Sequence, residues 1–354
     1  MSQLTGTHDI SSLLAAKHQT VAAFGEDTVI DVLQRDMQAH NLLMQDILAE
    51  LSVPSSDRQR LAGTSYSGEM VETDEYARAA TQKATPGQTV AFPLKKFSYA
   101  LGWTRQFLKK ATPADLAAGQ LAAQKAHRRR VLEEARKAIF LATNYTFYDL
   151  HVDNVQLAVK RLVNADSAKI PDGPTGEAFD GSTHTHYQAR VSTLANSDVD
   201  ALITDVAEHG HTRGLKLVIN FSNLTAISGL SKFTPLTGPM VVPGSGSDRT
   251  SVLLDVEAPA DNRLVGFWDG AYPIWVKPWA VANYVLCYAA GEDAKPLVER
   301  FDANYGRGLQ FEGEIDLYPL RVDYMDAWLG FGVWTRTNGA VLYTGGTTWA
   351  DPSL

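Results

Sequence analysis

Cysteine is almost missing from this chain of 354 residues, which contains only Cys287. A single thiol excludes an internal disulfide framework and is typical of proteins that fold in a reducing compartment. The residues on either side of it, within 284–288 (YVLCY), are apolar or aromatic. Because such a setting raises the pKa of a thiol, we predict a buried structural role for Cys287 rather than a reactive one.

Signals for a membrane are missing as well. Residues 1–7 (MSQLTGT) lack the basic start and the apolar core of a secretory signal. The only candidate span, residues 271–290, is interrupted by proline, lysine and asparagine, whereas a membrane helix needs about 20 mostly uninterrupted apolar residues. We expect residues 271–290 to lie in a buried core, with no membrane partner and with synthesis in the cytoplasm.

The sequence has no excess of positive charge, since its formal net charge is −8. This argues against a surface that holds nucleic acid tightly through its phosphates, and the arginines 128–130 are better explained as a solvated helix face. The composition, 45% hydrophobic and 20% charged, is that of a folded soluble protein. We expect the tryptophans of the C-terminal third of the chain to lie in the core or in an interface and not to stack on nucleic-acid bases. These are Trp268, Trp275, Trp279, Trp328, Trp334 and Trp349.

Signatures of catalysis are absent too. There is no Gly-x-Ser-x-Gly and no His-Glu-x-x-His, and residues 244–248 (GSGSD) are too short for a nucleotide-binding loop. An exposed strand face explains the acidic residues near the C-terminus more simply than a glycosidase pair does: Asp302, Glu312, Glu314, Asp316 and Asp323. We therefore expect no enzyme, no catalytic residue and no cofactor.

Histidine provides the one pattern with metal-binding character. His184 and His186 share a face of an extended segment, and His209 and His211 form a second pair next to Glu208. Two such pairs could make a zinc site with Glu208 as ligand or base. The pattern resembles the opening His-x-His of cupins, but the glutamate that should follow is absent. We predict that these histidines form a hydrogen-bonded cluster or a polar subunit contact and not a metal site.

Residues 112–142 form the most strongly predicted element. Thr112 supplies an N-cap, Pro113 a first helical residue and Asp115 an acidic first turn, and about 30 residues give a helix of about 45 Å. Its apolar stripe is narrow, which is typical of a strut lying across other elements: Ala117, Leu121, Leu132, Ala135, Ile139 and Ala142. The charged residues Arg129, Arg130, Glu133 and Lys137 are expected to point away.

The segment before this helix changes its apolar face. Val90, Phe92 and Leu94 alternate on one side, and the aromatic and aliphatic residues of 97–103 alternate on the other. A strand of this kind contacts two neighbours, as a hairpin does when its tip lies on another subunit. Residues 52–88 form a long polar stretch, so the amphipathic helix predicted over 27–51 has nothing nearby to bury it and should dock at a distance or on a partner.

The remaining pattern alternates helices and strands. It predicts a helix from Ser197 with Gly210 just after its end, a short helix over 294–300, and loops over 165–181 and 222–250. Strands are predicted over 215–221, 263–268, 274–277 and 309–317, and residues 283–289 fit strand or helix. Asn338-Gly339 predicts a hairpin between strands at 328–336 and 340–343.

Three stretches carry a family resemblance: 92–104 leading into the long helix, 274–284 with Lys-Pro-Leu-Val-Glu-Arg at 295–300, and 318–324 with 331–341. Together they resemble a tailed-bacteriophage major capsid protein of the Hong Kong 97-type fold, over roughly residues 25–345. The resemblance implies an α+β fold in four parts. These are an N-terminal arm with an amphipathic helix (1–60), an extended β-hairpin loop (61–110), a peripheral domain with a long spine helix (111–160 and 300–354) and an axial α/β domain (161–299).

The same resemblance implies a function. It predicts a virion protein that self-assembles as pentamers and hexamers into an icosahedral shell, with double-stranded DNA held inside by confinement. Portal and decoration proteins are further implied partners, with either a separate scaffolding protein or none. No lysine and asparagine can be identified as a cross-linking pair. Two alternatives stay open: an encapsulin-like bacterial compartment of the same fold, and a metal-dependent enzyme that uses the two histidine pairs.

Overall fold

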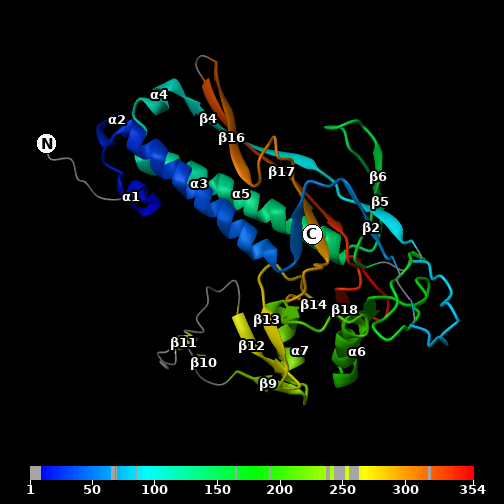
Figure 1. The fold of residues 1–354 in the computed structure, drawn as a ribbon. Helices are drawn as coiled ribbons and strands as arrows, with labels where there is room; N and C mark the ends of the chain where they lie inside the picture. Colours follow the sequence, from blue (N-terminus) through cyan, green and yellow to red (C-terminus); the bar gives the residue numbers. More distant parts are fainter. Residues whose placement is uncertain are drawn as a thin grey trace.

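The structure is a computed structural model that describes residues 9–64, 68, 70–84, 86–163, 166–190, 193–236, 240–242, 252–254, 263–317 and 320–354. Two long helices run side by side beneath a sheet of long strands, and a second, seven-stranded sheet with its own helices occupies the opposite part of the molecule (Figure 1). No helix within the described ranges is long and apolar enough to cross a membrane.

The longest helix is α5, Pro113–Phe140, as predicted. Thr112 and Asp115 form a reciprocal capping box, which satisfies backbone N–H groups at the start of the helix. Its buried face differs from the predicted apolar seam, because Leu121 and Leu132 are only half-buried. Four polar side chains of the helix are buried instead: Gln120, Gln124, His127 and Glu134.

The helix α3 (Glu26–Ala49) explains three of these buried polar residues. Gln120 and Gln124 donate hydrogen bonds to the Asp36 carboxylate at 2.9 and 2.7 Å, and His127 contacts His40 at 3.0 Å. Two short helices, α1 (Ile10–Ala15) and α2 (Val21–Phe24), complete the helical layer. Of the two predicted alternatives, the structure therefore shows the first: one face of α3 docks at a distance on its own chain.

A sheet built around one very long strand covers the helices. Strand β17 pairs with β16 on one side and with β4 over all ten residues of β4, and further along it pairs with β15. Strand β1 completes the sheet beside β15 in parallel. The bounds are β1 Ser52–Ser55, β4 Lys95–Thr104, β15 Leu297–Arg300, β16 Leu309–Leu317 and β17 Leu320–Val333; the one-turn helix α4, Arg105–Leu108, follows β4.

The short helix predicted over 294–300 is wrong, because residues 297–300 form β15. This strand lies between β1 and β17, and all four of its residues are buried. A helix there would have left the polar backbone groups of two neighbouring strands without partners. Local spacing favoured a helix, but the two strands on either side decided the outcome.

The predicted change of apolar face in 89–104 is confirmed, but the single strand predicted there is wrong, because the run forms two strands and the second pairs with its own chain. Val90, Phe92 and Leu94 are buried, and Phe97, Tyr99 and Leu101 are half-buried towards α5. Residues 88–91 form β3 in a four-stranded sheet, whereas β4 pairs with β17 of its own chain. The four-stranded sheet has the order β2-β3-β6-β5, with β2 Gln59–Ala62, β3 Gln88–Ala91, β5 Tyr145–Tyr148 and β6 Gln156–Val159.

The seven-stranded sheet has the order β7-β18-β14-β8-β13-β12-β9. Its strands are β7 Tyr187–Ala189, β8 Leu215–Ile219, β9 Phe233–Pro235, β12 Arg263–Trp268, β13 Tyr272–Val276, β14 Tyr284–Ala289 and β18 Ala340–Tyr343. Helix α6 (Asn196–Ala207) packs on it, beginning one residue before Ser197, and Gly210 adopts φ +84° just beyond its end. The predicted loop 222–250 contains η1 Phe221–Asn223, α7 Leu224–Ser228 and β10 Met240–Val242, which pairs with β11 Val252–Leu254.

The hairpin predicted through Asn338-Gly339 is wrong. Strands β17 and β18 belong to different sheets, so the chain leaves one sheet and enters the other at this turn. Asn338 is fully buried, and its side chain bonds to the backbone of Ala289 and Ala294. The asparagine joins the turn to β14 instead of closing a hairpin.

The crossing of residues 91–94 over β17 gives a first testable prediction. A Cβ at Gly330 would overlap the carbonyl oxygen of Pro93, so Gly330→Ala should lower the free energy of unfolding by about 1–3 kcal/mol. Gly102→Ala in β4 is the matched control, because its Cβ would meet nothing within 4 Å. Urea unfolding of unassembled subunits measures both variants; equal effects would contradict the close crossing.

Candidate assembly surfaces and a histidine cluster

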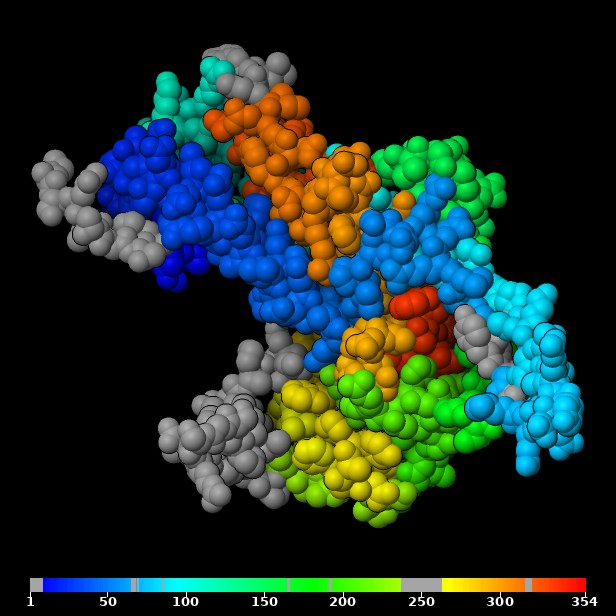
Figure 2. All heavy atoms as spheres, in the orientation of Figure 1, coloured from blue at the N-terminus to red at the C-terminus, as the bar shows by residue number. Residues whose placement is uncertain are grey.

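Residues 63–87 connect β2 to β3, and we name them the extended loop. Their described part 70–84 projects from the body of the molecule (Figure 2). Every described residue of 70–84 is exposed, including the large apolar side chains of Met70, Val71 and Tyr76. These side chains have no core of their own chain to enter, so the loop presents an apolar surface to its surroundings.

A buried ion pair fixes the root of this loop. Arg300 in β15 donates a hydrogen bond of 2.8 Å to the Asp149 carboxylate, and Asp149 is fully buried. The same guanidinium donates to the carbonyl oxygen of Phe92 at 3.0 Å. Arg58, on the approach to β2, lies 3.9 Å from Asp149 and pairs with Asp153 at 2.7 Å. Both ends of the extended loop are therefore held by charged groups at its base.

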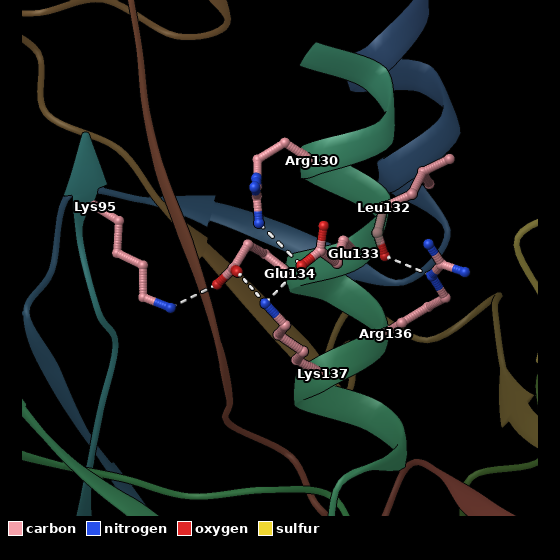
Figure 3. A network of polar contacts seen from close by, with 7 residues as sticks. All are labelled: Lys95, Arg130, Leu132, Glu133, Glu134, Arg136 and Lys137. Atoms are coloured by element: carbon pink, nitrogen blue, oxygen red, sulfur yellow. Dashed lines mark hydrogen bonds and ion pairs between the residues drawn. The ribbon is translucent and has the colours of Figure 1, made fainter. Parts of the chain in front are cut away.

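A second set of ion pairs joins the start of β4 to α5 (Figure 3). Lys95 lies 2.6 Å from Glu134, and Lys137 bridges Glu133 and Glu134 at 2.7 and 3.0 Å. Burial raises the pKa of Glu134, but its hydrogen bond and charge interaction with Lys95 outweigh this, and the net shift is downwards. Arg130 pairs with Glu133 at 2.9 Å, so one of the three arginines of 128–130 belongs to this network instead of a free basic patch.

Glu50, at the end of α3, joins the helical layer to the seven-stranded sheet. Its carboxylate lies 2.6 Å from Lys277 and 2.8 Å from Lys216, and it accepts a hydrogen bond from Tyr288 at 3.0 Å. Burial on its own raises the pKa of Glu50, but the Lys277 charge and the hydrogen bonds from both lysines outweigh it and lower the pKa from 4.5 to about 2. The ionised form is thus bound more tightly in the folded protein.

This shift predicts how stability depends on pH. Because the folded-state pKa of Glu50 is depressed, its contribution is complete above pH 4.5 and is lost as the pH falls towards about 2. Glu50→Gln should lower the free energy of unfolding at pH 7 by about 1 kcal/mol, allowing for solvent screening. The difference from the parent protein should shrink through that pH window.

Urea unfolding at a series of pH values tests this prediction. Glu75→Gln, on the exposed part of the extended loop, is the control and should leave the unfolding midpoint unchanged. A difference between Glu50→Gln and the parent that stays constant from pH 7 to about 2 would contradict the assignment.

Two further surfaces expose large apolar side chains. On α3, Ile30, Leu42 and Leu43 are each more than half exposed, although the opposite face of the helix is buried on α5. On β16, Phe311 and Ile315 are exposed in the same way. Aliphatic and aromatic side chains spaced along one helix and one strand form surfaces that a neighbouring copy could cover.

The predicted histidine pairs are only partly brought together. The Nε2 atoms of His184, His186 and His209 lie 2.9–3.2 Å from one another, and one carboxylate oxygen of Glu208 lies 3.3 Å from His184 Nε2. His211 points elsewhere, and its Nε2 lies 2.9 Å from the hydroxyl of Thr337. We name His184, His186 and His209 the histidine triad.

The triad is partly buried, with His186 the most enclosed of the three rings. Burial lowers the pKa of His186 and of His209 to about 3, so both imidazoles are neutral near pH 7. The ring of Phe179 covers His184 and His209, at centroid distances of 4.7 and 4.2 Å. A cavity of about 370 Å³ opens on the other side, with His184 and His186 in its wall.

The cysteine, two of the acidic residues and three of the tryptophans singled out in the sequence lie in the core or on an exposed strand face. Cys287 is fully buried and burial raises its pKa, as predicted. Glu312 and Glu314 lie exposed on β16, which agrees with the solvated face expected there. Trp268, Trp279 and Trp328 are buried in the core, whereas residues 244–248 lie outside the described part of the chain. The ion pairs at the loop root and at Glu50 were not predicted, because no local pattern marks a charge that distant segments bury.

Comparison with known proteins bears on the fold. No protein-family model and no curated protein matches the sequence. A solved structure from Mycobacterium phage Patience is similar over 99% of this chain and 96% of its own, with 18% identity and a TM-score of 0.64. The capsid of a native GTA particle matches 84% of this chain and 90% of its own, with 15% identity and a TM-score of 0.48.

An encapsulin complex from Synechococcus elongatus is a further match, over 88% of this chain and 90% of its own, with 12% identity and a TM-score of 0.44. The TM-scores of this match and of the match to the GTA capsid are below 0.5, so we base no conclusion about the fold on them. The similarity to the Mycobacterium phage Patience structure extends along nearly the whole chain and is enough to establish the fold. The chain has the Hong Kong 97-type fold, with a long helix, a long-stranded sheet and a mixed α/β sheet.

Proposed function

We propose that this protein is a major capsid protein that self-assembles into an icosahedral shell around double-stranded DNA. The observation that carries the proposal is the fold, shared from end to end with the phage structure at a TM-score of 0.64. The extended loop supports it independently, because a fully exposed segment on a rigid, ion-paired root suits contact with a neighbouring subunit.

The parts of the chain take roles in this proposal. Residues 1–60 form the arm, 61–110 the region that contains the extended loop, 111–160 with 300–354 the peripheral domain, and 161–299 the axial domain. Two strands depart from these predicted bounds: β4 lies in the long-stranded sheet beside β17, and β18 lies in the seven-stranded sheet beside β14. The axial domain meets other copies around the centre of pentamers and hexamers, and the extended loop lies over an adjacent subunit. Heterologous contacts of this kind close into rings when the rotation between copies allows it.

The shell holds DNA by confinement and not by specific contact. A net charge of −8 disfavours tight phosphate binding, and Arg130 is already paired with Glu133. The protein acts as a structural component without catalysis, in the virion, after assembly in the host cytoplasm. Portal, decoration and scaffolding proteins are its further partners where the virus encodes them.

Particle contents distinguish this proposal from its nearest alternative. Particles are purified from infected or induced cells by sedimentation, treated with nuclease from outside, and analysed for protected DNA and for cargo protein. Protected double-stranded DNA supports a viral shell. Shells that contain an enzyme and no DNA would instead identify an encapsulin-like compartment.

A further inference from the structure

The histidine triad has a hydrogen-bonding problem that protons cannot solve. An imidazole nitrogen either carries a proton and donates, or carries a lone pair and accepts. Three nitrogens in mutual contact form an odd ring, so at least one of the three contacts must pair two donors or two acceptors. At 2.9–3.2 Å such a contact is repulsive, and the burial of His186 strengthens the repulsion at that ring.

The backbone settles the orientation of one ring. His186 is buried, and its Nδ1 lies 3.0 Å from the carbonyl oxygen of Gly339, which can only accept a hydrogen bond. Nδ1 of His186 therefore carries the proton, and Nε2 presents a lone pair towards His184 and His209. This is the arrangement in which metal-binding histidines are held by an outer hydrogen bond.

The distances match a shared cation. Four ligands at about 2.0–2.1 Å around a tetrahedral zinc ion lie about 3.3 Å from one another. The three Nε2 atoms are 2.9–3.2 Å apart, and the Glu208 carboxylate oxygen is 3.3 Å from the Nε2 of His184. A divalent cation turns three competing lone pairs into three bonds.

We propose that His184, His186 and His209 bind a divalent transition metal, zinc before others. Their ligand atoms all lie within 4.8 Å of one another, and the Glu208 carboxylate lies beside this set, 3.3 Å from His184. Three imidazoles are a ligand set that zinc accepts in a tetrahedral site, with water at the fourth position. The ligands come from two distant places: the segment before β7 and the end of α6. Through Gly339, the site also reaches the turn that leads into β18.

Metal analysis of the unassembled protein tests the proposal directly, whether or not the subunit forms shells. The protein is purified without metal-affinity chromatography and dialysed, and its zinc is measured by mass spectrometry. We expect about one zinc per chain in the parent protein. His209→Ala should lose most of it, and Glu208→Gln should bind zinc about 10-fold to 100-fold more weakly.

The matched control is His211→Ala, which removes a neighbouring histidine outside the triad and should keep its zinc. Cobalt exchanged into the parent protein provides a readout that does not depend on any variant folding. A visible spectrum typical of four-coordinate cobalt is expected, together with a fall in thermal stability on chelation that added zinc reverses. A metal-free parent protein that neither binds added zinc nor gives this cobalt spectrum would overturn the proposal, as would equal zinc loss in His211→Ala.

Discussion

Deleting residues 70–84 from the extended loop should abolish shell formation and leave a folded subunit. Every one of these residues is exposed, and none takes part in a strand or helix, so their removal takes nothing from the core. The shorter connection between β2 and β3 also costs less closure entropy. For the assembled shell, in contrast, the deletion removes Met70, Val71 and Tyr76 and with them the apolar contact proposed with an adjacent subunit.

Two measurements separate folding from assembly in this experiment. Circular dichroism and urea unfolding should match those of the parent subunit, and negative-stain microscopy should show no closed particles. The control Thr73→Ser with Thr81→Ser changes the same loop without removing its apolar residues and should still give shells. Normal particles from the deletion variant would show that the extended loop has no part in the subunit contacts.

Replacing Arg300 should have the largest effect on the stability of the subunit itself. Arg300→Met removes the 2.8 Å partner of a fully buried carboxylate and leaves it only Arg58 at 3.9 Å, so we expect a cost of about 3 kcal/mol, the lower end of the range for breaking a buried pair. The variant also loses the hydrogen bond to the carbonyl of Phe92 at the loop root. The free energy of unfolding, measured in urea near neutral pH, should fall by that amount.

The exposed pair Arg35 and Asp31 gives the matched control. Its atoms lie 2.6 Å apart, but 47% and 64% of the two side chains are exposed, so Arg35→Ala should cost less than about 0.5 kcal/mol. The double variant Arg300→Met with Asp149→Asn should recover part of the loss, because the buried charge is then gone. A loss below about 1 kcal/mol for Arg300→Met alone would contradict a buried clamp at the loop root.

Local chemistry predicted the parts of the fold that depend on neighbouring residues. The Thr112 capping box placed α5, and the alternation of apolar residues predicted the change of buried face after Leu94, although not the break there between β3 and β4. The same reasoning failed where distant segments decide. Asn338-Gly339 has the residues of a hairpin turn, but buried bonds to Ala289 and Ala294 use the asparagine to connect two sheets.

Buried polar contacts were the least predictable features. Gln120 and Gln124 fell outside the apolar stripe of α5, and only the carboxylate of Asp36 on another helix explains why they are buried. The histidine pattern was informative in part: it indicated His184, His186 and His209. The sequence pattern could not exclude His211, because the path of the chain after α6 decides whether the ring of His209 or that of His211 faces His184 and His186.

Electron cryo-microscopy of purified particles shows whether copies of this chain form a closed shell. We expect icosahedral particles of pentamers and hexamers, with residues 63–87 of each subunit resting on an adjacent copy. Protein that remains monomeric or dimeric, with no capsomers or shells, would contradict this expectation.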